Sequence, residues 1–87
     1  MIFIPKRRIV MEGVIGLEKA LLAIAAALAI GLSALATAWA QARIGAAGAG
    51  TLAEKPELTA TVIILVAIPE TMVILGFVVA SMILLME

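Results

Sequence analysis

The sequence predicts an all-α membrane protein, an antiparallel hairpin of two transmembrane helices that assembles into a homo-oligomer. The first observation is composition: 66% of the 87 residues are hydrophobic and 14% are charged, whereas soluble chains are about 45–50% apolar. The second is that the apolar residues form two long runs, and roughly 20 such residues cross the hydrocarbon core as a helix. The third, small residues nearly all round the first run, predicts the oligomer.

Residues 1–18 mix apolar and charged side chains and are predicted to form an interfacial N-terminal arm. Three basic residues at positions 6–8 are followed by apolar residues that alternate with Glu12 and Glu18, as in segments that lie at a membrane surface. Two alternatives stay open. One is a cleaved signal peptide, which the length of the following apolar run disfavours. The other is a translation start at Met11.

Residues 19–53 are predicted to form the first transmembrane helix. The 23 residues between Lys19 and Arg43 carry no charge, and Ala, Gly and Ser dominate the segment. Small side chains let helices approach closely, which drives helix association in lipid. We therefore expect neighbours on several sides, with the first helices forming an inner layer of an oligomer. The residues expected at these contacts are Ala23, Ala27, Gly31, Ala34, Ala38, Gly45 and Gly48.

A polar loop at residues 54–57 is predicted to join the two helices. It reads Glu-Lys-Pro-Glu, where the charges favour water and proline disfavours helical backbone in the residue before it. Residues 58–87 form the second predicted transmembrane helix, rich in Val, Ile, Leu and Met. Both runs are expected to be helical because unpaired backbone groups are unfavourable in lipid. Bulky aliphatic side chains suit a lipid boundary, so the second helix is expected in an outer layer.

Glu70 interrupts the second apolar run near its middle and is the main candidate for function. An ionised carboxylate is strongly unfavourable at that depth, and such residues by default mark ion or proton pathways. Protonation, a basic partner or a bound cation would neutralise it. The structural alternative is an acid that only hydrogen-bonds a neighbouring helix.

Gln41 is predicted to lie level with Glu70. If the chain turns between Lys55 and Pro56, the two residues stand equally far from the turn on facing helices. The Gln41 amide can coordinate a cation through its oxygen or donate a hydrogen bond to the carboxylate. Both uses would neutralise Glu70.

Further oxygen atoms are expected at the same height. Thr71 adds a hydroxyl beside the acid. Pro69 has no N–H, which leaves the carbonyl of Leu65 without its helical donor and distorts the turn around Ile68. A carboxylate, an amide oxygen, a hydroxyl and freed carbonyls form the hard-oxygen set that suits an alkali cation.

The composition also excludes several classes of function. The sequence contains no Cys and no His, which rules out the usual zinc sites and Ser-His or Cys-His catalysis. It has no P-loop for a nucleotide, and its formal net charge of zero gives no basis for nucleic-acid binding. We expect no organic cofactor, no nucleic-acid partner and no bond chemistry. The alternative function is a small pore-forming or regulatory two-span membrane protein.

Three segments of the sequence resemble the proteolipid, or c subunit (also called subunit K), of rotary ATP synthases and ATPases. They are the run Gln41 to Gly50, the loop Glu-Lys-Pro-Glu, and Pro69-Glu70-Thr71 followed by Ile74-Leu75-Gly76. The resemblance extends over about residues 15–87. It is closer to the archaeal and vacuolar-like branch than to bacterial F-type proteolipids, whose loop usually reads Arg-Gln-Pro.

This resemblance implies a ring of identical hairpins in a prokaryotic cell (inner) membrane, surrounded by membrane lipids and rotating against stator subunit a with its essential arginine. Glu70 would carry the ion. The central stalk would contact the loop through Glu54, Lys55, Pro56 and Glu57, which places the loop in the cytoplasm. The positive charges oppose this topology, because more of them lie on the terminal side than in the loop; we follow the resemblance.

The resemblance also bears on the ion. In sodium-coupled relatives, the positions that match Gln41, Glu70 and Thr71 and the carbonyl that matches Ile68 contribute to the ion site. This favours Na⁺ at Glu70, Gln41 and Thr71. Vacuolar-like sodium sites tend to carry further polar groups where this chain has Met72 and Leu75, so H⁺ stays the alternative.

Overall fold

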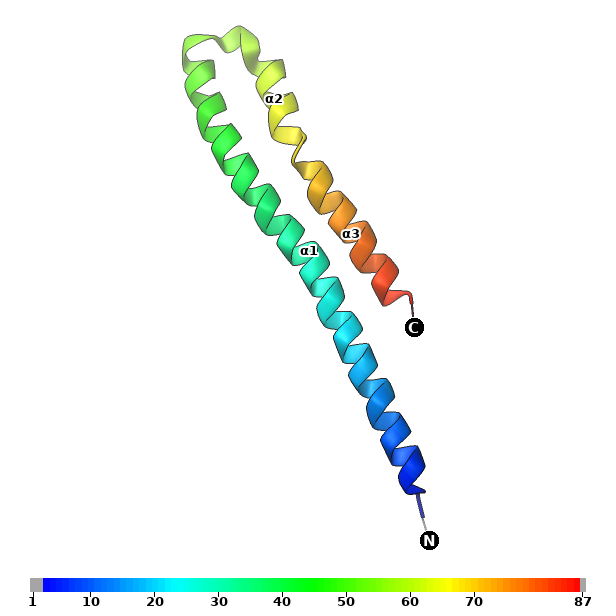
Figure 1. Ribbon diagram of the computed structural model, residues 1–87. Coiled ribbons are helices and arrows are strands. Elements are labelled where there is room, and N and C mark those ends of the chain that lie inside the picture. Colours follow the sequence, from blue (N-terminus) through cyan, green and yellow to red (C-terminus); the bar gives the residue numbers. More distant parts are fainter. Residues whose placement is uncertain (1–2, 87) are drawn as a thin grey trace.

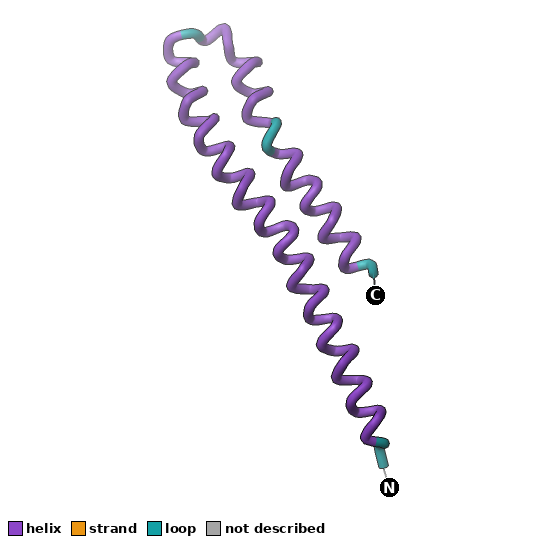
Figure 2. Tube along the Cα trace, in the orientation of Figure 1, coloured by secondary structure: helices purple, strands orange, loops and turns teal. Residues whose placement is uncertain are grey.

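The computed structural model describes residues 3–86, and these form an antiparallel helical hairpin (Figure 1). Helix α1 spans Lys6–Glu54 and makes up the first arm. The second arm contains the 3₁₀ turn η1 (Pro56–Leu58), helix α2 (Thr59–Ala67) and helix α3 (Glu70–Leu84). Figure 2 shows the short non-helical link between α2 and α3. The molecule measures 79 × 17 × 16 Å, so it is a rod one helix pair wide.

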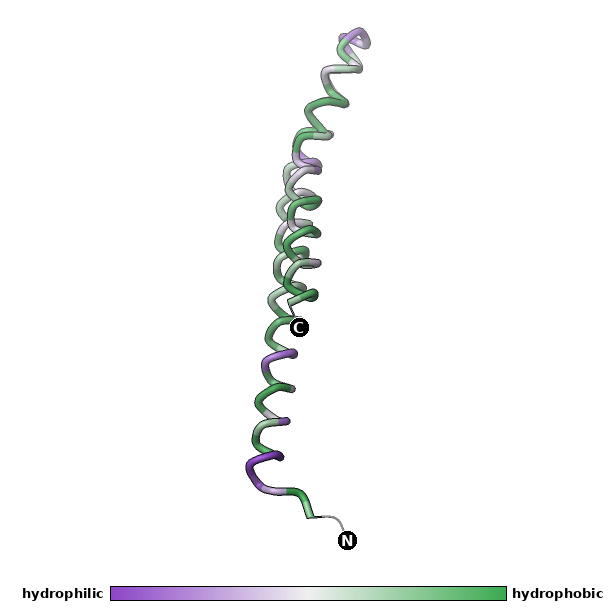
Figure 3. The backbone as a smooth tube through the Cα atoms, turned by 90° about the vertical axis from the view of Figure 1, so that its right-hand side faces the viewer, coloured by the Kyte–Doolittle hydropathy of each residue, from purple (hydrophilic) through white to green (hydrophobic). Residues whose placement is uncertain are grey.

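Helix α1 is continuous through the segment predicted as a separate arm. It contains 49 residues, which corresponds to about 73 Å at 1.5 Å per residue. The end of the second arm lies near residues 15–22, because Met86 shares a hollow with Ile15, Glu18, Lys19 and Leu22. The first turns of α1 therefore extend beyond the end of α3 (Figure 1). Figure 3 shows that hydrophilic and hydrophobic residues alternate along this extension. Its position at the membrane surface stays a prediction.

Both arms are long and apolar enough to cross a membrane. The two candidate spans are Lys6–Glu54 and Pro56–Leu84, and only 11% of the most apolar window of each is buried within the hairpin. Most large aliphatic side chains therefore point outward, which suits lipid better than water. The predicted all-α hairpin with two membrane-length helices is confirmed. Assembly into a ring stays a prediction.

The chain reverses direction at Lys55, within the predicted loop. The Lys55 N–H donates to the Thr51 carbonyl at 2.7 Å and ends α1, and the Lys55 carbonyl accepts the Leu58 N–H at 3.0 Å. Pro56 opens η1, where its missing N–H is not needed. Residues 54–57 are all exposed at the tip of the hairpin, where another protein can reach them.

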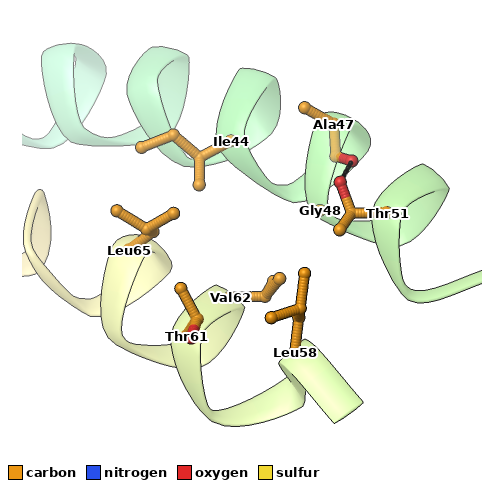
Figure 4. A pocket seen from close by; sticks show the side chains of 8 residues that line it. All are labelled: Ile44, Ala47, Gly48, Thr51, Leu58, Thr61, Val62 and Leu65. Atoms are coloured by element: carbon orange, nitrogen blue, oxygen red, sulfur yellow. Dashed lines mark hydrogen bonds between the residues drawn. The ribbon is translucent and has the colours of Figure 1, made fainter. Parts of the chain in front are cut away.

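Two glycines allow the arms to pack closely. A Cβ atom at Gly48 would lie 2.5 Å from Cγ1 of Val62, and one at Gly76 would lie 2.6 Å from Cβ of Ser33. Both distances are too short for non-bonded carbon atoms. Figure 4 shows Gly48 opposite Val62, beside an apolar hollow near the loop end of the hairpin. Larger residues at these positions would push the arms apart.

The hairpin leaves most of the predicted small-residue contacts uncovered. Gly48 is buried against the second arm and Gly31 and Gly45 are half-buried. The exposed residues of this set are Ala23, Ala27, Ala34 and Ala38. Besides Gly48, helix α1 turns Ala26 and Thr37 toward the second arm, and neither of these two belongs to the predicted set. The four alanines thus form a flank of α1, here called the alanine flank, that is free for contacts outside the chain. Such contacts stay a prediction.

Candidate functional site

The second arm is broken at Ile68 and Pro69, between α2 and α3. Pro69 has no N–H to donate, so the regular α-helical ladder cannot continue through it. The Thr71 N–H bonds the Ile68 carbonyl at 3.1 Å, and the Met72 N–H bonds the Pro69 carbonyl at 3.0 Å. A tight turn with three-residue spacing thus replaces one turn of α-helix. The sequence predicted a distortion at this place.

Two side chains of α1 hold the broken region. Thr37 is 4% exposed and donates its hydroxyl to the Pro69 carbonyl at 3.0 Å. Gln41, one turn further along α1, donates through Nε2 to the carbonyl of Val66 at 3.1 Å. The carbonyl of Val66, just before the break, and that of Pro69, within it, therefore accept hydrogen bonds from the facing helix.

Glu70 is the first residue of α3, directly after the break. Its Oε2 accepts a hydrogen bond of 2.9 Å from Nε2 of Gln41, so one amide group bridges the Glu70 carboxylate and the Val66 carbonyl. The two side chains lie level, as the residue count from the loop predicts. Glu70 is exposed on the side of the hairpin, and no basic side chain of residues 3–86 forms an ion pair with it. Neutralisation must therefore come from outside this part of the chain or from a proton.

The other predicted ligands are not brought to the carboxylate within one chain. Thr71 donates its hydroxyl to the carbonyl of Ile68 at 2.8 Å, on its own arm. The carbonyl that Gln41 contacts belongs to Val66, the residue after Leu65. No described hydrogen bond joins Leu65, Ile68 or Thr71 to Glu70, and their part in ion binding stays a prediction.

Thr37 and Val66 were not among the site residues predicted from the sequence. Thr37 had a sequence signal: Ser33, Thr37 and Gln41 are four residues apart, so they share one face of a helix. A polar row on an otherwise apolar helix predicts hydrogen bonds to a facing helix. Val66 had no such signal, because it contributes only its backbone carbonyl.

The donor set within one chain is small. Among residues 3–86, no group of three or more His, Cys, Asp or Glu side chains lies close enough together to hold a metal ion. One carboxylate and one amide suit a proton, or a monovalent cation that takes further oxygen ligands from elsewhere. The fold and the site together define a membrane protein of two spans with one carboxylate, that of Glu70, beside the break in its second arm.

The comparisons with known proteins agree with this class. The profile of the ATP synthase C-subunit family matches residues 24–83. The A-type ATP synthase subunit K of Methanocaldococcus jannaschii is 40% identical over 62 residues, which make up 71% of this chain and 28% of the relative. The chain thus spans little more than a quarter of that relative's length. The chain belongs to the C-subunit family of ATP synthases.

Family membership confirms the resemblance found in the sequence, including its similarity to an archaeal relative. As a c-type subunit, the chain is a non-catalytic membrane component. Members of the family bind the ion that is transported.

Proposed function

We propose that the chain is a rotor-ring subunit that carries Na⁺, or alternatively H⁺, across the membrane on Glu70. The ring turns against stator subunit a, and the exposed loop at residues 54–57 contacts the central stalk in the cytoplasm. The observation that carries the proposal is the 2.9 Å hydrogen bond from Gln41 to Glu70 beside the Pro69 break. It places an amide against the carboxylate in a chain of the ATP synthase C-subunit family.

The mechanism depends on what neutralises the carboxylate at each stage. Facing lipid, an ionised Glu70 is unfavourable, so the site there holds its ion or proton. Facing the arginine of the stator and water, the ionised form is stabilised and the ion leaves. Moving one charge through 100 mV is worth about 2.3 kcal/mol, so several ions must pass for each ATP. A ring of many identical subunits provides this ratio.

Gln41 can serve either ion. Its Nε2 donates to Glu70 and Val66, which stabilises an ionised carboxylate that holds no cation. Rotation of the amide group by half a turn would present its oxygen to the carboxylate instead. That oxygen would coordinate Na⁺, or would accept a hydrogen bond from protonated Glu70.

A neighbouring copy would complete the sodium site. The Thr71 hydroxyl donates to the Ile68 carbonyl, so these two oxygen atoms lie together, apart from the hydrogen bond between Gln41 and Glu70. In a ring of identical hairpins, one flank faces the opposite flank of the next copy. The Ile68 carbonyl and the Thr71 hydroxyl of one copy would then approach Glu70 and Gln41 of the next.

Labelling with dicyclohexylcarbodiimide, which reacts with carboxyl groups in apolar surroundings, tests this proposal. We expect modification of Glu70 in membrane vesicles, slowed by Na⁺ at constant pH if the ion is sodium. Labelling that depends on pH but not on Na⁺ would indicate the proton. Glu70→Gln should abolish the labelling, whereas Glu57→Gln in the exposed loop should not alter it. Absence of reaction at Glu70 would contradict the ion-carrying function.

A further inference from the structure

Arg43 carries a charge that the proposed mechanism does not use. It follows Gln41 by two residues, about 200° round the helix, so Gln41 faces the second arm while Arg43 is exposed on the opposite side of α1. Its Cζ lies 5.2 Å from the centroid of the Trp39 ring. No acidic side chain of residues 3–86 forms an ion pair with it. The guanidinium therefore needs an anion or water from outside the described chain.

The depth of this charge follows from its stacking contact. Trp39 lies one turn before Arg43, so packing over that ring directs the guanidinium back along α1, away from the loop. Side chains on a helix lean toward its N-terminus, which opposes an extension of Arg43 toward water at the loop. Trp39 is two residues, or about 3 Å of helix axis, from Gln41. The charge thus lies at nearly the same height as Glu70.

The exposed face of α1 around Arg43, here called the free face, changes character at this height. A row of large exposed apolar residues runs along it and ends one turn before Arg43: Leu21, Ile24, Leu28, Leu32, Leu35 and Trp39. On the loop side of Arg43, the exposed residues of α1 up to position 50 are all Ala or Gly. The second arm differs, because large exposed aliphatics continue on both sides of Glu70, from Ile63 to Leu85.

We propose that Arg43 and Trp39 bind the phosphate headgroup of an anionic phospholipid on the free face of α1. A guanidinium binds phosphate through charge-assisted hydrogen bonds. An indole beside it favours the boundary between headgroups and acyl chains. On this face, the boundary between lipid headgroups and acyl chains lies at the height of Glu70. At the same height, the second arm contacts acyl chains.

This site rests on the proposed ring. The hairpin is only about 17 Å wide, so a single copy cannot keep two lipid surfaces at different heights. A closed ring separates lipid inside, which contacts the free faces of α1, from lipid outside, which contacts the second arms. The inner lipid surface on the loop side is then displaced toward the middle of the membrane, to the Arg43 level.

Trp39 is the sole tryptophan of the chain, so its fluorescence reports on this site alone. The full chain is assembled in mixtures of phosphatidylglycerol and phosphatidylcholine, with lipid present before assembly so that it reaches both faces. One lipid carries a quencher, either on its headgroup or at the end of an acyl chain. We expect headgroup labels to quench Trp39 more strongly than chain-end labels. We also expect the site to bind phosphatidylglycerol about fivefold more strongly than phosphatidylcholine. At equal mole fraction, labelled phosphatidylglycerol should therefore quench Trp39 more than labelled phosphatidylcholine does.

Arg43→Gln should bring this preference close to one, and Arg43→Lys should retain most of it. The matched control Arg7→Gln removes the same charge far from Trp39 and should change nothing. Stronger quenching by chain-end labels, or an unchanged preference in Arg43→Gln, would overturn the lipid site. So would loss of the preference on adding inorganic phosphate, because the site would then take a soluble anion. Cross-linking that shows no oligomer would instead contradict the rotor ring, and the lipid site with it.

Discussion

Thr37 lies buried between the two arms, where its hydroxyl donates to the carbonyl of Pro69 at 3.0 Å. Pro69 directly precedes Glu70, so this hydrogen bond holds the backbone from which the carboxylate projects. Thr37 makes no described contact with the carboxylate itself. We therefore regard it as a positioning residue for the proposed ion site, one turn from Gln41 on the same face of α1.

Thr37→Val is expected to weaken ion binding. Valine keeps the shape of threonine but removes its hydrogen bond to the Pro69 carbonyl, which then keeps only the Met72 N–H as donor. The net loss of one such bond is about 0.5–1.5 kcal/mol. If half of this free energy is lost from ion binding, the Na⁺ concentration that halves carbodiimide labelling of Glu70 rises by up to about threefold. In the proton case, the pH midpoint of labelling shifts instead. Thr37→Ser, which keeps a hydroxyl, should stay near the wild type. A Thr37→Val protein that unfolds more easily but labels normally would show a structural role only.

The pairing of Gln41 with Glu70 could be predicted from the sequence for a simple physical reason. In a hairpin of two regular helices, the number of residues from the turn sets the height of each side chain. The contact with Val66 could not be predicted in this way. Which carbonyl Gln41 reaches depends on how the second arm is rotated at the Pro69 break, and the residue count carries no information on that rotation.

The boundaries of the elements were harder to predict than their existence. An interfacial arm is predicted for residues 1–18, and α1 begins within it, at Lys6. No proline interrupts the sequence between positions 6 and 55, and Arg8 and Glu12 support the first turns with an ion pair of 3.4 Å at helical spacing. Alternating polarity therefore does not end the helix, and the membrane-surface position of this segment stays a prediction.

The spacing of the two arms depends on Gly76, and Gly76→Ala tests this. An added Cβ would lie 2.6 Å from Cβ of Ser33 and 2.9 Å from the Ala29 carbonyl oxygen. The backbone oxygen cannot move without a shift of α1. We expect a loss of about 1–3 kcal/mol in stability, the usual range for overpacking, measured as an earlier unfolding midpoint in mixed detergent.

Gly13→Ala is the matched control, because apart from its chain neighbours and the adjacent backbone of its own helix, no atom of the described residues lies within 4 Å of a Cβ at Gly13. That change should be neutral or slightly stabilising, since alanine favours helix over glycine by about 1 kcal/mol. Equal unfolding midpoints for the two variants would contradict the idea that close contact at Gly76 positions the arms.

For the molecule as a whole, a single hairpin leaves the Glu70 carboxylate and the alanine flank of α1 uncovered. Glu70 stays exposed on the side of the rod, and no part of residues 3–86 covers the alanine flank of α1. An acid within an apolar run and a helix rich in small residues can both be recognised in a single sequence, so these two features could be predicted. The site's remaining ligands, the ion and the number of copies depend on contacts between chains, which no residue count within one chain determines.

The alanine flank leads to a prediction about assembly. Ala34 lies on this flank and is exposed in the hairpin. In the proposed ring, first helices pack closely through small residues, and the bulk of a leucine would hold them apart. Ala34→Leu is therefore expected to weaken each contact between first helices about tenfold, which corresponds to about 1.4 kcal/mol, and so to lower the assembled fraction. Cross-linking after reconstitution or native mass spectrometry would measure this fraction.

Ala60→Leu provides the control for that prediction, because it makes the same change at an exposed position on the second arm. Position 60 is two residues before Val62, which faces Gly48 of the first arm, and two residues are about 200° round the helix, so its side chain points toward the surrounding lipid. Added bulk there meets only acyl chains, and assembly should equal that of the wild type. If both variants assemble fully, the first helices do not form the closely packed inner layer. If both fail, the outer face of the second arm also contacts another chain, and the two-layer ring is wrong.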